Sequence, residues 1–189
     1  MNGEGGPNRP ARTKHLIPSN SVEPKNWVMI AKKILIGCLW LLIAGPAMGQ
    51  EVRSVKVTEL ERMIAGSKTP LILNFWATYC KPCIAEMPHF EKLAAKYKAK
   101  GLTVVFVSLD MEDDYPAKVD SFVQKRKLQN RVVWLNETNA DYFCPKIDPK
   151  WSGAIPATLF VNAAKGYRRF FEEELTEEEL EKEIMAILK

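Results

Sequence analysis

A short apolar segment that ends in two closely spaced cysteines constrains the fold of this 189-residue chain more than any other feature. Residues 71–76 read Leu-Ile-Leu-Asn-Phe-Trp, and Cys80 and Cys83 follow with Lys-Pro between them. Apolar residues then recur at helical spacing, at Ile84, Met87, Phe90, Leu93 and Ala94. The pattern predicts a strand and then a cysteine on the first turn of a helix, where free N–H groups and the helix dipole stabilise a thiolate. Two intervening residues let both sulfurs meet within one turn and form a reversible disulfide.

The two cysteines are expected to have different roles. Cys80, at the helix N-terminus, is the predicted nucleophile, and Cys83, one turn further on, is predicted to be buried and to resolve the mixed disulfide. Lys81 adds positive charge near the Cys80 sulfur and should lower its pKa. A structural disulfide or half of a zinc site are the alternatives. Zinc needs four ligands, and the predicted domain adds only His89 and Cys144, so no metal or cofactor is expected.

The other elements follow from apolar periodicity and capping residues. Strands are expected at 52–57, 71–76, 102–109, 131–135, 158–162 and 167–171, and helices at about 58–66, 81–100, 117–128, 138–143 and from 176 onward. Thr58 with Glu61, and Thr176 with Glu179, have the spacing of capping boxes. The acidic loop 110–116 lacks the spacing of an EF-hand and is expected to be a solvated turn. Cys144 is expected to be a buried free thiol, with a third redox cysteine as the alternative.

The segment around the cysteines resembles the thioredoxin superfamily, and in particular the TlpA/ResA-like group of exported, membrane-associated thiol–disulfide oxidoreductases. The matching residues are Phe75, Trp76, Ala77, Cys80, Lys81, Pro82, Cys83, Glu86, Pro88, Ile155 and Pro156. The resemblance covers roughly residues 51–189. It implies an α/β thioredoxin fold, in which helices flank a central mixed sheet and a strand-helix insertion precedes the cis-proline loop.

The resemblance also implies roles for residues outside the cysteine pair. Thioredoxin carries a buried aspartate where this chain has Asn74, and an amide cannot accept a proton. In the TlpA/ResA-like group a glutamate at the position of Glu86 is thought to take the acid–base role. Glu86 lies one helical turn beyond Cys83. The alternative is an ordinary solvated glutamate on the helix surface.

The substrate side of the site is expected around a proline. Ile155-Pro156 resembles the cis-proline loop that faces the active site throughout the superfamily, and backbone beside it can pair with an extended substrate segment. Trp76 and Tyr79 are expected to form walls of the thiol pocket. For Trp76, packing in the core is an equal alternative.

The first 49 residues are expected to be a leader. Residues 1–28 are interpreted as disordered, or as the result of a misassigned start, because Met29 alone would begin an ordinary signal peptide. Residues 29–49 combine Lys32-Lys33, an apolar stretch and a small-residue cleavage site after Gly49, which is typical of a signal peptide. An uncleaved membrane anchor is the alternative, although the apolar run is short for a span of ~20 residues. The predicted thioredoxin-like domain covers 50–189.

The charge distribution narrows the choice of partners. Residues 1–49 contain six Lys/Arg and two Asp/Glu, whereas residues 50–189 contain 21 of each, so the predicted domain is neutral and nucleic acid is not an expected partner. A protein thiol or disulfide substrate is expected in the periplasm or at the outer cell surface, with a membrane electron donor as a further candidate and membrane contact only through the leader. A thiol peroxidase and a copper-binding assembly factor are the rival functions. Thr78 stands too close to Cys80 for the peroxidase motif, and copper proteins of this fold place three residues between their cysteines.

Overall fold

The computed structural model describes residues 50–189, and the expected leader lies outside these residues. The strands are β1 (Arg53–Val55), β2 (Leu71–Trp76), β3 (Thr103–Ser108), β4 (Arg131–Leu135), β5 (Ala157–Asn162) and β6 (Tyr167–Phe171). The helices are α2 (Val57–Ala65), α3 (Lys81–Tyr97), α4 (Ala117–Arg126), α5 (Ala140–Ile147) and α6 (Glu177–Leu188). No helix within residues 50–189 is both long and apolar enough to cross a bilayer.

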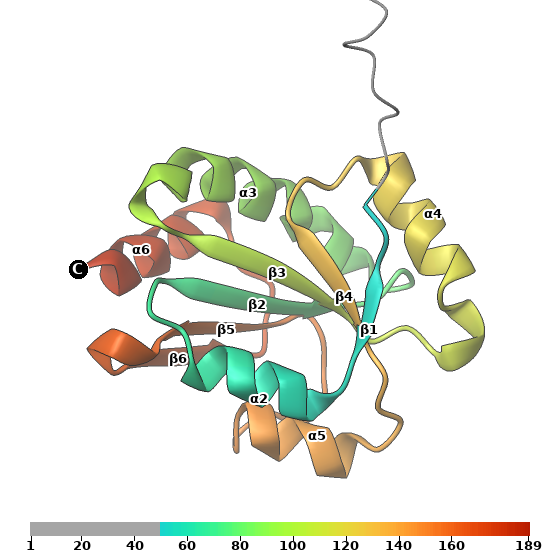
Figure 1. The fold of residues 1–189 in the computed structure, drawn as a ribbon. Helices are drawn as coiled ribbons and strands as arrows, with labels where there is room; N and C mark the ends of the chain where they lie inside the picture. The colour runs from blue at the N-terminus through green and yellow to red at the C-terminus, as the bar shows by residue number, and fades with distance from the viewer. Residues whose placement is uncertain (1–49) are drawn as a thin grey trace, which may run out of the picture. The chain divides into compact units, whose positions relative to one another are not determined.

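The six strands form one mixed sheet in the order β1-β4-β3-β2-β5-β6. Strands β1 to β4 pair in parallel, whereas β5 runs antiparallel to β2 and β6 antiparallel to β5. Helices α3, α4 and α6 cover one face of the sheet, and α2 and α5 cover the other (Figure 1). All six residues of β2 are buried, because this strand lies inside the sheet and both of its faces are covered. The predicted α/β thioredoxin fold is confirmed, including the β4–α5 insertion before the proline loop.

The start of the first described helix was predicted two residues too late. Its N-cap is Lys56 and not Thr58, because Glu59 rather than Glu61 reaches back, and Glu59 Oε1 accepts a hydrogen bond from the Lys56 N–H at 3.3 Å. The Val57 N–H donates to Glu137 Oε1 at 3.2 Å. A residue 80 positions further along the chain therefore completes this cap, and a local pattern cannot reveal it.

Helix α5 also differs from the expected range of 138–143. It begins at Ala140 and continues through Pro145 to Ile147. Phe143, Cys144 and Ile147 are buried at helical spacing. Most helical stability in proteins comes from packing of an apolar face, so this packing carries the helix past the predicted end at 143 and through Pro145.

The capping box of α6 gives a testable stability contribution. Thr176 Oγ1 accepts from the Glu179 N–H at 3.3 Å, and Glu179 Oε2 accepts from the Thr176 N–H at 3.0 Å. We expect Thr176→Ala to lower the free energy of unfolding by about 1 kcal/mol, because one helix N–H loses its acceptor. Urea unfolding measures this loss. Thr176→Ser keeps the hydroxyl, and serine caps a helix at least as well as threonine, so this variant should keep the stability of the parent. An equal loss in both variants would contradict the capping role.

Candidate active site

The two cysteines lie where β2 leads into α3. Cys80 is the N-cap residue of α3 and forms a disulfide with Cys83, with the two Cα atoms 5.3 Å apart. The Cys80 N–H donates to the Ala77 carbonyl at 3.0 Å, and Cys80 Sγ accepts from the Cys83 N–H at 3.3 Å. Cys80 is 7% exposed and Cys83 is fully buried. The sulfur at the helix end is therefore the one nearer solvent, and it already faces a backbone donor that favours a thiolate.

Glu86 belongs to a buried polar cluster one turn beyond Cys83. Its side chain is fully buried, so the solvated alternative is wrong. Glu86 Oε1 accepts from Asn74 Nδ2 at 2.8 Å, and Oε2 accepts from the Leu175 N–H at 3.0 Å. Asn74 Nδ2 also donates to Thr158 Oγ1 at 3.0 Å. Strand β2 and the segment before α6 thus donate directly to the Glu86 carboxyl, and β5 joins the cluster through Asn74.

The environment of Glu86 changes its acidity. Burial raises the pKa of the carboxyl from 4.5 to about 7, while the hydrogen bonds from Leu175 and Asn74 oppose part of that rise. Glu86 therefore gains and loses a proton near neutral pH. Asn74 Oδ1 is buried and has no hydrogen-bond partner. If the Asn74 amide turns over, this oxygen can accept the proton of a neutral Glu86 carboxyl.

The proline loop lies beside the end of β2 that leads to the cysteines. The Ile155–Pro156 peptide bond is cis. Pro156 is buried and Ile155 is half-buried. Ala157, the next residue, pairs with Phe75, so Pro156 lies beside the last residue of β2. The sheet register therefore places the loop at the same edge of the molecule as the Cys80–Cys83 pair.

The two aromatic residues expected at the pocket lie in different environments. Trp76 is fully buried, and its ring packs on Phe122 of α4 with the ring centroids 4.9 Å apart. Tyr79 is 57% exposed and directly precedes Cys80. Tyr79 is thus available to contact a substrate in this conformation, whereas the Trp76 ring supports the site from the core.

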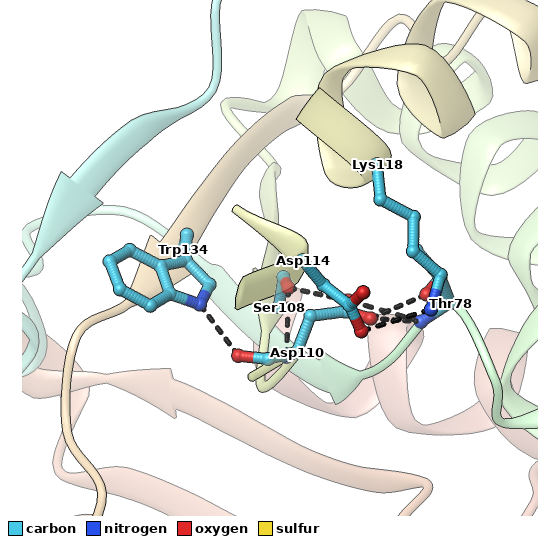
Figure 2. A network of polar contacts seen from close by, with 6 residues as sticks. All are labelled: Thr78, Ser108, Asp110, Asp114, Lys118 and Trp134. Atoms are coloured by element: carbon cyan, nitrogen blue, oxygen red, sulfur yellow. Dashed lines mark hydrogen bonds and ion pairs between the residues drawn. The ribbon is translucent and has the colours of Figure 1, made fainter. Parts of the chain in front are cut away.

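Asp110 was expected in a solvated turn, and this prediction is wrong. Its side chain is only 4% exposed. Both carboxylate oxygens accept from the Thr78 N–H at 3.1 Å, Oδ1 also accepts from Thr78 Oγ1, and Oδ2 accepts from Ser108 Oγ at 2.8 Å (Figure 2). The position of Asp110 just after β3 could have indicated that it lies near the cysteines. The carboxyl ends of parallel strands meet at one edge of the sheet, and β2 leads to the cysteines at that same edge.

Cys144 lies in a different core layer from the disulfide. It packs among the apolar residues between the sheet and helices α2 and α5, whereas Cys80 and Cys83 pack on the opposite face. Burial raises the pKa of the Cys144 thiol to about 11. The thiol is therefore neutral at pH 7, and the sheet lies between it and the Cys80–Cys83 pair. No three His, Cys, Asp or Glu side chains among residues 50–189 converge as ligands for a metal ion.

The sheet order and the cysteine pair at the start of α3 define a thioredoxin-fold protein with a Cys-x-x-Cys site. The family model described as the AhpC/TSA family matches residues 46–166. The chain belongs to the AhpC/TSA family.

Individual proteins agree with this assignment. The thiol-disulfide oxidoreductase ResA of Oceanobacillus iheyensis is 48% identical over 58 residues, which are 31% of this chain and 29% of that protein. ResA of Halalkalibacterium halodurans is 32% identical over 112 residues, 59% of this chain and 55% of that protein. The chain thus spans about half or less of the length of these relatives. The structure of a thioredoxin-related protein from Neisseria meningitidis serogroup B shares the fold, with a TM-score of 0.54, 24% identity, and coverage of 64% of this chain and 85% of that one.

Proposed function

We propose that this protein is a thiol–disulfide oxidoreductase that reduces or exchanges disulfides in other proteins. One observation carries the proposal: the Cys80–Cys83 disulfide lies at the N-terminus of α3, with the more exposed sulfur accepting a backbone N–H. This arrangement stabilises a nucleophilic thiolate and places a resolving thiol beside it. The names of the ResA relatives agree with this activity.

The reaction proceeds through a mixed disulfide. The Cys80 thiolate attacks one sulfur of a substrate disulfide, the substrate S–S bond breaks, and the other substrate sulfur leaves as a thiolate. The Cys83 thiolate then attacks Cys80 Sγ, which forms the Cys80–Cys83 disulfide and releases the second substrate thiolate. Two electrons pass from the cysteine pair to the substrate, and the two released thiolates take up protons.

Glu86 is proposed to accept the proton of Cys83 before the second attack. It lies one turn from Cys83, and its pKa of about 7 lets it accept a proton at neutral pH. Glu86 and Asn74 are both fully buried, so the carboxyl has no direct contact with bulk water. Any link from Glu86 to bulk water must therefore pass through a local opening of the packing around it.

Substrate binding is proposed at the exposed edge of the site. Tyr79 and the backbone beside Ile155 and Pro156 flank the end of β2 and are suited to hold an extended segment that contains the target disulfide. Trp76 supports this surface from the core. The leader pattern in residues 29–49 favours export and a periplasmic or outer-surface location, with retention by an uncleaved anchor as the alternative. A membrane electron donor would then reduce the Cys80–Cys83 disulfide after each reaction.

The two rival functions need residues that this site does not supply. The peroxidase motif Pro-x-x-x-Thr-x-x-Cys would require proline at position 73 and threonine at position 77 relative to Cys80, where the chain has Leu73 and Ala77. For the copper-binding rival, the cysteine spacing is one residue too short. The one histidine among residues 50–189, His89, is half-exposed and pairs with Glu177 at 3.2 Å. An oxidoreductase is therefore favoured over a peroxidase or a copper-binding factor.

The activity can be tested with the reduced protein and glutathione disulfide. We expect the parent protein to consume the disulfide and to form its own Cys80–Cys83 bond, as followed by mass spectrometry of alkylated samples. Cys80→Ser should abolish exchange, because it removes the sulfur nearer to solvent and leaves only the fully buried Cys83 at the site. Cys144→Ala should exchange at the parent rate, since that thiol lies in the other core layer. Activity that survives in Cys80→Ser but disappears in Cys144→Ala would refute the assignment.

A further inference from the structure

One buried carboxylate joins the loop after β3 to the segment that leads into Cys80. Asp110 accepts hydrogen bonds from the Thr78 N–H at 3.1 Å, from Thr78 Oγ1 at 2.5 Å and from Ser108 Oγ at 2.8 Å. The Asp110 carbonyl accepts from Trp134 Nε1 at 2.7 Å (Figure 2). Trp134 is itself buried on β4. The backbone of Asp110 is thus held by the sheet, and its side chain holds Thr78.

These hydrogen bonds are stronger than ordinary loop contacts. A carboxylate that is 4% exposed costs free energy unless donors replace its water. No Lys or Arg within residues 50–189 forms an ion pair with Asp110; the nearby Lys118 pairs with Asp114 at 2.9 Å. The Thr78 and Ser108 donors therefore compensate the charge, and hydrogen bonds of this charged kind are roughly twice as strong as neutral ones.

Thr78 lies two residues before Cys80, in the turn that sets the position of the Cys80 sulfur. That turn is closed by the bond from the Cys80 N–H to the Ala77 carbonyl at 3.0 Å. A shift of Thr78 would move Cys80 relative to the Cys83 N–H, which donates to Cys80 Sγ at 3.3 Å. We propose that Asp110 is a positioning residue that holds Cys80 at the N-terminus of α3 for thiol–disulfide exchange. This inference rests on the proposed function.

Asp110 acts on the Cys80 thiolate in two opposite ways. By fixing Thr78 it keeps the sulfur near the helix N–H groups, which lowers the thiol pKa. Its negative charge raises that pKa. The other charged or titratable groups near this end of the site include Tyr79 and Lys81, the sequence neighbours of Cys80, the Lys118–Asp114 pair, and the buried Glu86. Substitutions at Asp110 itself separate the two effects, because asparagine removes the charge and keeps an acceptor for Thr78, whereas alanine removes both.

The test compares Asp110→Asn with Asp110→Ala. The reduced proteins are mixed with glutathione disulfide for the exchange rate, and Cys80 alkylation by iodoacetamide is followed against pH. We expect Asp110→Ala to exchange about tenfold more slowly than Asp110→Asn, because alanine also removes the neutral hydrogen-bond acceptor for Thr78 that asparagine keeps. Its alkylation midpoint should lie at higher pH than that of Asp110→Asn. Asp114→Ala removes a charge from the same loop without contacting Thr78 and should exchange within about twofold of the parent.

Several results would overturn the positioning role. Equal exchange rates and equal alkylation midpoints in Asp110→Ala and Asp110→Asn would do so, as would an Asp114→Ala variant as slow as Asp110→Ala. If Asp110→Ala does not fold, Thr78→Val against Thr78→Ser decides, because only serine keeps the hydroxyl donor; Val should be slower, and equality contradicts the proposal. If the parent protein shows no exchange, the proposed function fails, while the alkylation midpoints still test whether Asp110 positions Cys80.

Discussion

Replacing Cys83 by serine is expected to lock Cys80 to its substrate in a mixed disulfide. In the proposed reaction Cys83 resolves this intermediate, and its buried sulfur is the one that forms the disulfide with Cys80. A serine hydroxyl cannot attack the mixed disulfide, so the adduct should change from a transient species to the main product. Reductant-sensitive bands on a non-reducing gel measure the effect, and the masses of the trapped proteins identify the substrates.

The reciprocal variant is the control for this experiment. Cys80→Ser keeps Cys83, which is fully buried and should give no adducts. The double variant Cys83→Ser, Cys144→Ala should trap the same partners as Cys83→Ser alone, because burial keeps the Cys144 thiol neutral and raises its pKa to about 11. Adducts that depend on Cys144, or that form through Cys83 in the Cys80→Ser variant, would refute the assigned order of attack.

Replacing Glu86 by glutamine is expected to slow the resolving step by about a hundredfold at neutral pH, which is the usual scale of general acid–base catalysis. The parent rate should rise with pH as Glu86 loses its proton around a pKa of about 7, and the variant should lack that rise. Stopped-flow measurement of exchange from about pH 5.5 to about pH 8.5, a range that brackets this pKa, tests the prediction. The control is Glu178→Gln, which replaces an exposed glutamate on α6. Identical profiles in Glu86→Gln and the parent would remove Glu86 from the reaction.

Although Glu86→Gln is expected to slow exchange, it is expected to make the folded protein more stable at high pH. Burial raises the pKa of Glu86 from 4.5 to about 7, so the folded state favours the neutral carboxyl. The resulting stability is fully present below about pH 4.5 and is lost as pH rises through about 7, for a total of about 3 kcal/mol. Glu86→Gln lacks this loss, so urea unfolding of the oxidised proteins should favour the variant more at about pH 8 than at about pH 5. Parallel pH dependences would show that Glu86 titrates normally.

Glutamine should fit the cluster because its neighbours can rearrange. In Glu86→Gln the side-chain amide oxygen can keep the hydrogen bond from the Leu175 N–H, and the amide nitrogen can donate to Asn74 Oδ1 once the Asn74 amide turns over. That Asn74 oxygen has no partner in the present arrangement. Thr158 Oγ1 can then donate to Asn74 Oδ1 instead of accepting from Nδ2. The activity loss in Glu86→Gln is therefore expected without loss of the fold.

The sequence by itself determined the elements whose signals are local. The apolar runs at Leu71–Trp76 and Arg131–Leu135 became β2 and β4 with the predicted bounds, because each is flanked by polar or turn-forming residues that end a buried strand. The position of Cys80 at the start of α3 also followed from the strand–cysteine–helix order. Hydrophobic periodicity and the spacing of two thiols depend on neighbouring residues alone.

Only the tertiary structure decided which polar residues of the site are buried and which groups they contact. The sequence could not tell whether Glu86 is solvated or buried, because its burial depends on distant contacts such as the hydrogen bond from the Leu175 N–H, 89 residues further along the chain. Asp110 looked like any acidic turn residue until the sheet brought Thr78 against it, 32 positions earlier in the sequence. The sheet likewise placed Cys144 and the disulfide on opposite faces. Burial and long-range hydrogen bonds set the acidity and position of such groups, and both depend on which distant segments the fold brings together.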